Sequence, residues 1–212
     1  MRLLISLLLS LLTLPLLDAQ ELKVIKLEAP DKAGGAPLMK VFNNRKSDRE
    51  FSTAKLRPQD LSTLLWAANG INRPDGKRTA PSAVNAQDVD VYVLFQEGAY
   101  LYDAKAHALT PVAAGDYRGD VAGRQESVKA APVILVLVSD LERLSKTPDE
   151  GTQRTAAVDV GIVSQNINLV CAGLGLATVP RGSMDQDALR KALKLKPTQL
   201  LLINNPVGYP KQ

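Results

Sequence analysis

One segment, AVDVGIVSQNINLVCAGLGL, constrains the fold more than any other part of the chain. It is predicted to form a long helix, from about Ala156 to Ala172, with apolar residues nearly all round. Such a helix must be covered on more than one side, either by a sheet of its own domain or by a second subunit. The segment APVILVLVSD is apolar at successive positions, which predicts a strand buried on both faces.

The remaining elements predict a mixture of helices, hairpins and strands. A helix is expected from Arg57 to Gly70, and a shorter one over PLMKVFNNR with Leu38, Val41 and Phe42 as its apolar face. DVDVYVLF and QLLLINNPVGYP are predicted strands, GAYLYD and ALTPV a hairpin whose turn carries His107, and LRKALKL a surface helix. Because some strands are joined by helices and others by turns, the pattern favours an α+β fold with a mixed or antiparallel sheet.

The N-terminal residues predict export. Met1 and Arg2 precede an apolar run from Leu3 to Leu17, which is too short to span a bilayer and ends in small and polar residues. We expect a signal peptide over residues 1–19, an extended arm over 20–37 and one domain over 38–212. No later segment is judged long and apolar enough to be a membrane anchor, so the mature protein is expected to be soluble and periplasmic or secreted.

Charge and composition narrow the function. The net charge of +4 is spread along the chain without basic blocks interleaved with aromatics, so nucleic-acid binding is not expected. The single cysteine, Cys171, excludes an internal disulfide, and the single histidine, His107, excludes the usual two-histidine zinc clusters, so no metal site is predicted. Redox chemistry would therefore need a bound organic cofactor.

A basic cluster follows the first predicted helix. Arg45, Lys46, Ser47 and Arg49 place two guanidiniums, an ammonium and a hydroxyl within five positions. These groups suit a phosphate monoester, because Arg binds its oxygens in a fork and Lys and Ser add further donors. A solvated basic turn is an equally good interpretation of these residues alone.

Three further segments carry candidate ligand-binding groups. Ser82, Asn85 and Gln87 lie in a long polar loop just before a strand, where amides suit the edge of a pyrimidine-like ring, although such residues are also common in turns. The segment TVPRG, residues 178–182, allows close approach of a flat ligand, or is an ordinary turn with Ser183 or Asp185 capping the next helix. The C-terminal NNPVGYPK would direct Lys211 into a pocket or form a frayed tail.

Taken in order, four motifs resemble the nitroreductase family. They are RKSDREF, LLWAANGINRPDGKRTAPSAVNAQ running into DVYV, GIVSQNINLVCAGLGLATVPRG, and NNPVGYPK, together covering about Leu38 to Lys211. The resemblance is greatest to the branch similar to the dehydrogenases of thiazole- and oxazole-forming systems. It implies an α+β sandwich with a mainly antiparallel central sheet flanked by helices, forming a homodimer with two FMN sites at the subunit interface.

The resemblance also assigns roles to residues. Arg45, Lys46, Ser47 and Arg49 would hold the FMN phosphate and ribityl chain with help from Lys211, and Ser82, Asn85 and Gln87 would address the ring from the other side. Pro180, Arg181 and Gly182 would lie along the isoalloxazine, with Arg181 and Gly182 at the catalytic position near the flavin N5. The expected activity is hydride transfer from NAD(P)H or another reductant to a small-molecule acceptor such as a nitroaromatic or quinone.

Two departures from the family pattern affect the expected substrate. Arg181 stands where several members have an acidic residue, which would favour an anionic or electron-rich substrate or a different tuning of the flavin. No Lys-Tyr pair like that associated with azoline oxidation is present, so azole formation is not expected. An exported flavin-binding or ligand-binding protein with little turnover, and an α+β domain without flavin, are the alternatives.

Overall fold

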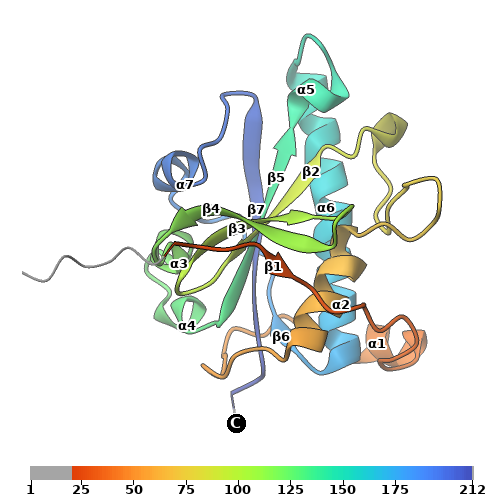
Figure 1. Cartoon of the computed structure of the whole chain (residues 1–212), viewed down its shortest axis with the longest axis vertical. Coiled ribbons are helices and arrows are strands. Elements are labelled where there is room, and N and C mark those ends of the chain that lie inside the picture. The colour runs from red at the N-terminus through yellow and green to blue at the C-terminus, as the bar shows by residue number, and fades with distance from the viewer. Residues whose placement is uncertain (1–20, 212) are drawn as a thin grey trace, which may run out of the picture.

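A computed structural model describes residues 21–211, so the expected signal peptide lies outside the described residues. Seven strands form one sheet in the order β1-β4-β3-β2-β5-β7-β6, and every neighbouring pair is antiparallel (Figure 1). Their bounds are β1 Ile25–Lys26, β2 Val89–Leu94, β3 Gly98–Asp103, β4 Ala108–Ala114, β5 Val133–Asp140, β6 Ala177–Thr178 and β7 Gln199–Gly208. The predicted hairpin is β3 and β4, and the predicted α+β class is confirmed.

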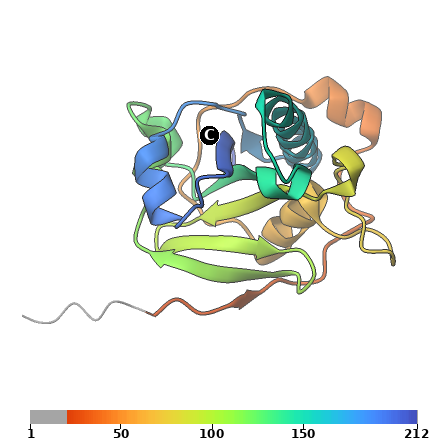
Figure 2. The same ribbon diagram turned by 90° about the horizontal axis from the view of Figure 1, so that it is seen from above.

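Helices cover both faces of the sheet (Figure 2). They are α1 Leu38–Asn44, α2 Pro58–Asn69, α3 Arg118–Ala122, α4 Glu126–Lys129, α5 Leu141–Leu144, α6 Glu150–Leu174 and α7 Gln186–Ala192, with a 3-10 turn, η1, at Ala83–Asn85. Alternate residues of β5 explain why it is apolar throughout. Leu135 and Leu137 pack in one core with α2 and α6, whereas Ile134 and Val136 pack in a second core with α3, α4 and α7.

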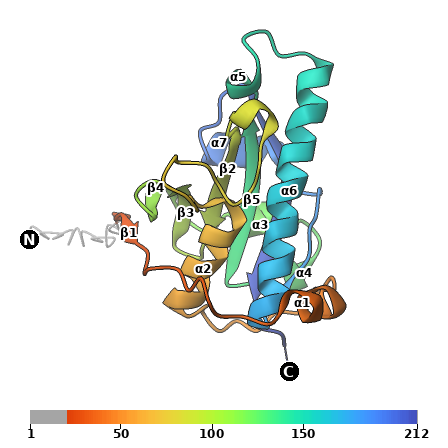
Figure 3. The same cartoon turned by 90° about the vertical axis from the view of Figure 1, so that its right-hand side faces the viewer.

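The long helix begins earlier than its apolar pattern predicts. Asp149 and Thr152 form a capping box, so α6 starts at Glu150 rather than near Ala156, and it ends at Gly175 in a left-handed conformation. Its inner side packs against α2, β5 and β7, and its outer side is uncovered in the single chain (Figure 3). Contrary to expectation, α6 is long and apolar enough to cross a membrane, but length and composition alone are weak evidence, and its inner side is packed in the core of the domain.

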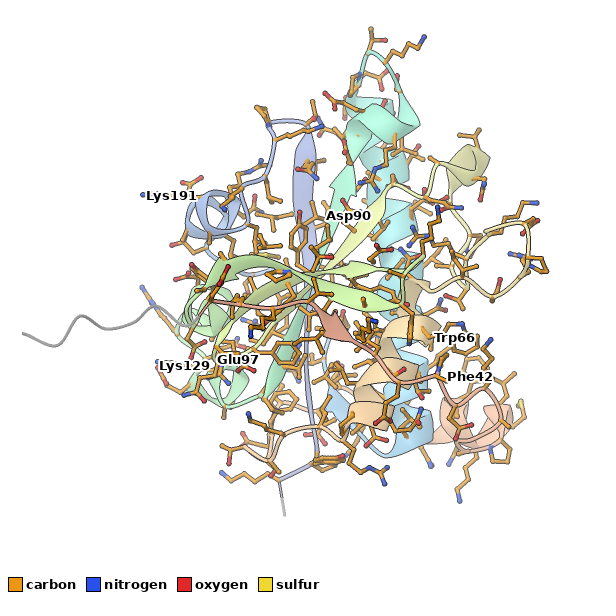
Figure 4. The ribbon with its side chains drawn as sticks, in the orientation of Figure 1. Phe42, Trp66, Asp90, Glu97, Lys129 and Lys191 are labelled. Carbon is orange, nitrogen blue, oxygen red and sulfur yellow. The ribbon has the colours of Figure 1, made fainter. Side chains whose placement is uncertain are left out.

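The short helix α1 differs from its predicted packing. Of the expected apolar face, only Val41 is buried, while Leu38 is 62% exposed and Phe42 is 51% exposed. Phe42 and Trp66 lie on the same side of the molecule, on α1 and α2 (Figure 4). The helix therefore contributes to an exposed apolar surface rather than to the core of the chain.

Residues 21–36 run extended along the edge of the sheet and across α2. β1 pairs with β4, and three polar side chains on one face of α2 then bind the arm. Gln59 Nε2 donates to Ala29 O at 2.9 Å, Ser62 Oγ to Glu28 O at 2.5 Å, and Thr63 Oγ1 accepts from the Asp31 N–H at 3.0 Å. These contacts fix the path that leads into α1.

Candidate functional site

The basic segment, residues 45–49, runs extended from the end of α1 to the edge of the sheet. The Asp48 N–H donates to Thr178 O at 2.9 Å, which places the segment beside β6. Lys46 Nζ lies 3.3 Å from Asp48 Oδ2, and neither Arg45 nor Arg49 forms an ion pair with any residue that the structure describes. Two guanidiniums are therefore available to a ligand at this edge.

The C-terminal residues lie against the same segment. Phe51 and Pro210 form an antiparallel bridge, and the Lys211 N–H donates to Glu50 O at 3.3 Å. Tyr209 OH donates to Asp60 Oδ2 at 2.6 Å, so the chain here is held and is not a frayed tail. Lys211 thereby lies next to the end of the basic segment, with its Nζ 3.8 Å from Glu50 Oε2.

A pocket of about 150 Å³ opens between the basic segment and the C-terminal end of α6. Its wall includes Lys46, Asn168, Gly175 and Thr178. Asn168 is buried and accepts from Asn205 Nδ2 at 3.3 Å, so polar groups of α6 and β7 form the inner side of the pocket. The pocket therefore has the Lys46–Asp48 ion pair in its wall and fixed amides on its inner side.

The Arg181 side chain is buried and faces the protein interior. Its Nε donates to Gln125 Oε1, and its terminal nitrogens donate to the carbonyls of Val121 and Ala122 and to the side chains of Asn204 and Ser183. Burial, followed by the nearby charge of Arg49, lowers the pKa of this guanidinium. With all five N–H groups used, the side chain ties the turn to α3 instead of pointing toward a substrate.

Gly182 is the residue of this turn that remains open to a ligand. The Arg181 N–H donates to Asn204 O at 2.9 Å, whereas the Gly182 N–H has no partner among the described residues. A Cβ added at Gly182 would meet only Leu202 O, at 3.9 Å. Asn204, which is fully buried and also donates to the carbonyls of Arg181 and Ser183, fixes this backbone. Sequence reasoning missed it, although an amide in an otherwise apolar strand was the available signal.

The candidate residues Ser82, Asn85 and Gln87 lie in a loop with a strained backbone, residues 81–87. Ser82 Oγ accepts from the Gln87 N–H at 2.8 Å, and Gln87 Oε1 accepts from Arg78 Nε at 3.0 Å, so two of the three candidate side chains already serve the loop itself. Asn85 is exposed, and Val84 at the tip is 90% exposed. Val84, Asn85 and Gln87 all have positive φ, a conformation that non-glycine residues rarely adopt.

The 81–87 loop and the basic segment lie at opposite ends of α6 (Figure 3). The Ala83 N–H donates to Asp159 Oδ2 at 2.9 Å near the beginning of the helix, while Ala172 lines the pocket near its end. At about 1.5 Å per residue these two positions of α6 are about 20 Å apart. One chain thus brings together the basic segment, Lys211 and the 180–182 turn, but not Ser82, Asn85 and Gln87.

An exposed apolar surface extends over α1, α2 and α6. Leu38, Met39 and Phe42 are exposed on α1, and Val158 is exposed on α6. Between α2 and α6 a groove of about 260 Å³ is lined in part by Trp66, Leu169 and Val170, and Lys32 Nζ lies 5.4 Å from the Trp66 ring centre. An apolar surface of this kind is typical of a protein interface.

The fold and this site define an α+β domain with a cationic edge beside an open backbone turn. The chain belongs to the nitroreductase family: residues 43–209 match the sequence profile described as "Nitroreductase family". Members of this family are oxidoreductases that typically depend on a flavin. The predicted family and its fold are confirmed.

Individual relatives support this membership. A protein of Methanocaldococcus jannaschii, provisionally named a nitroreductase, is 31% identical over 177 residues, which cover 79% of this chain and 88% of the relative. A crystal structure from Ralstonia eutropha, also provisionally named a nitroreductase, is 36% identical with a TM-score of 0.83, covering 89% of this chain and 90% of that one. A third, from Anabaena variabilis, shares the fold at 21% identity and a TM-score of 0.75. It covers 89% of this chain, which spans only 42% of that structure.

Proposed function

We propose that this protein is an FMN-dependent oxidoreductase that passes hydride from a reduced nicotinamide, or another donor, to an organic acceptor such as a nitroaromatic or quinone. The observation that carries the proposal is the N–H of Gly182, on a turn fixed by Asn204 and near Arg49. Among the described residues neither this N–H nor the guanidiniums of Arg45 and Arg49 have a partner. A flavin mononucleotide needs both features, a cationic site for its phosphate and a backbone donor for its ring.

The residues fit the cofactor by the chemistry of their donors. Arg45, Lys46, Ser47, Arg49 and Lys211 supply charge and hydrogen bonds for a phosphate at the edge of β6. Pro180 and Gly182 present a flat, open stretch of backbone along which an aromatic ring system would lie. When bound, the flavin supplies the redox chemistry, and these residues bind and orient it.

In this proposal Arg181 and Gly182, both predicted at the catalytic position, have different roles. Gly182 offers its N–H to the reacting edge of the ring, and Arg181 keeps that N–H in place through its buried guanidinium. No side-chain acid or base is required, because hydride passes directly between donor and acceptor. The motif order resembles the thiazole- and oxazole-forming branch, but azole formation is not part of the proposal.

We further propose that the working unit is a homodimer. If the uncovered sides of two α6 helices pack antiparallel, the beginning of one helix lies beside the end of the other. The 81–87 loop of one protomer then reaches the pocket of its partner, bringing Ser82, Asn85 and Gln87 toward the ring. The exposed apolar residues of α1 and α6 would be buried in the same interface.

The proposed location is outside the cytoplasm, on the basis of the expected signal peptide over residues 1–19, with no membrane anchor after cleavage and no nucleic acid as partner. Free NAD(P)H is scarce there, so the donor in the cell would be another reductant. Nitroaromatics and quinones remain the proposed acceptors, because both take hydride or electrons from reduced flavin.

The test is the visible absorption spectrum of the purified mature protein, reconstituted with FMN and then treated anaerobically with NADH, NADPH and dithionite. Flavin bands that bleach with a nicotinamide and return with a quinone support the proposal. Bands that bleach only with dithionite would favour a flavin-binding protein with little turnover, and no bands after reconstitution would refute FMN dependence. Replacing Arg45 and Ser47 together by Ala should weaken FMN retention by several kcal/mol.

A further inference from the structure

We propose that two buried carboxylates, Asp88 and Asp159, act as positioning residues that hold the 81–87 loop in its cofactor-facing conformation by sharing one proton. The inference rests on the proposed function, in which this loop contacts the flavin. It assigns a role to two acidic residues that lie behind the loop and that hydride transfer itself does not use.

Asp159 is the direct link to the loop. Its side chain is buried in the first half of α6, and Oδ2 accepts the Ala83 N–H at 2.9 Å. That N–H lies at the start of η1, immediately before the residues with positive φ. A strained loop persists only when its surroundings fix it, and this bond joins the loop to the most extensive helix of the described fold.

Asp88 lies just before β2 and is fully buried, and Asp159 is among the groups that raise its pKa. Its Oδ2 accepts a short hydrogen bond from Ser139 Oγ, but Oδ1 has no hydrogen-bond partner among the described residues. A buried carboxylate oxygen without a donor is costly, particularly beside a second carboxylate. A proton on Oδ1 removes both costs, because the resulting O–H can donate to Asp159.

The nearest cations direct their hydrogen bonds to other groups, although the charge of Arg143 still interacts with Asp88. Arg143 on α5 is held by Asp90 at 2.8 Å and lies 3.6 Å from Asp140, and it also donates to Gln87 O at 3.0 Å. Arg78 is engaged by Gln87 and Asn69 O on the far side of the loop. Burial, with a further contribution from Asp159, raises the pKa of Asp88 to about 6, against the opposing hydrogen bond from Ser139.

The consequence is a pH-dependent loop. Below about pH 6 Asp88 carries the proton, and its O–H can donate to the side chain of Asp159, which holds the Ala83 N–H. Above about pH 6 the ionised Asp88 carboxylate repels the side chain of Asp159, and water or a displaced side chain must separate the two. The loop then loses its fixed conformation, and the cofactor is held less tightly.

The matched variant is Asp88→Asn, whose amide can donate to Asp159 at every pH. The phosphate of FMN also titrates near pH 6, so the informative quantity is the ratio of FMN affinities of D88N and the natural protein from pH 5 to pH 8. We expect a ratio near one at pH 5 and about tenfold tighter binding by D88N at pH 8. The same substitution at exposed Asp187 should leave the ratio near one throughout. A flat ratio for D88N would overturn the proposal.

Hydrogen exchange of the loop amides in the protein without flavin keeps the proposal testable if FMN does not bind. Protection of Ala83 to Gln87 should fall at least fivefold between pH 5 and pH 8, after correction for intrinsic exchange, and should not fall in D88N. Ser139→Ala removes a bond that favours the carboxylate, so the midpoint should move to higher pH. If loop protection does not depend on pH in the natural protein, D88N or Ser139→Ala, the role of the pair is refuted. If protection depends on pH as expected but the protein does not bind flavin, only the proposed function is refuted.

Discussion

Arg181 shows how packing decides the role of a residue that a sequence motif singles out. The motif places it at the reacting turn, and the structure buries its guanidinium against two carbonyls of α3. Substitution by Met would remove the side-chain donor from the Val121 carbonyl, whereas Ala122 O would keep its bond from the Gln125 N–H. We expect Arg181→Met to lower the free energy of unfolding by about 2–4 kcal/mol in urea denaturation. Arg154→Met, at an exposed position of α6, should change it by less than about 0.5 kcal/mol; equal losses would show that Arg181 has no such anchoring role.

Substitution of Gly182 should affect cofactor binding without affecting stability. A methyl group there meets only one atom within 4 Å, so Gly182→Ala should fold with an unchanged Tm yet reduce FMN affinity by about tenfold, since it would approach the ring. In Gly208→Ala the added Cβ would lie 2.8 Å from Pro132 Cδ, and the variant should lose stability instead. Thermal melts and fluorescence titrations of both variants test this, and full FMN affinity in Gly182→Ala would remove the turn from the site.

His107 connects three parts of the fold. Its ring lies 2.8 Å from Ser62 Oγ and 2.9 Å from Tyr102 OH, and Ser62 in turn donates to the N-terminal arm. Burial lowers the pKa of His107, which favours the neutral ring. Replacing it by Ala should leave turnover intact and reduce stability by about 1–2 kcal/mol, measured in parallel by steady-state assay and denaturation. A large loss of turnover at full stability would instead reveal a proton donor.

At the scale of elements, α6 shows why a helix end can be missed. The residues from Glu150 to Thr155 are polar and exposed on most sides, so they carry no apolar period, and only the cap at Asp149 marks the beginning. We expect Asp149→Ala to lower stability by about 1 kcal/mol through loss of the bond to the Thr152 N–H. A thermal melt compared with Thr147→Ala, outside the cap, measures this loss, and no difference would show that the first turn needs no cap.

Most elements could be predicted from sequence because their signals are local. The apolar run of β5, the hairpin of β3 and β4, and the cap of α7 by Asp185 are each determined by residues close together in the chain. The separation of the 81–87 loop from the basic segment could not be predicted, because it depends on which end of α6 each segment meets. The exposure of Leu38 and Phe42 was missed for a related reason. The sequence of an apolar helix face does not indicate whether the surface that covers it belongs to the same chain or to another.

At the scale of the whole molecule, the proposed dimer predicts complementation. A variant with Arg45 and Ser47 replaced by Ala and a variant with Ser82 and Asn85 replaced by Ala should each bind FMN poorly. Mixed dimers of the two would contain one intact site assembled from unaltered residues of both protomers. We therefore expect flavin binding and activity to return on unfolding the two together and refolding them. Absence of recovery in demonstrably mixed dimers would contradict a shared site.

The place of β7 in the sheet has a consequence for when this chain can fold. Its ten residues are the last strand in sequence, yet they lie between β5 and β6 and pair with both. Until they leave the ribosome, the long apolar strand β5 has no neighbour on that side, and Asn204 is not available to fix the 180–182 turn. The sheet can therefore close only after residues 199–208 have been synthesised, and until then β5 is an unpaired apolar strand of the kind that promotes aggregation.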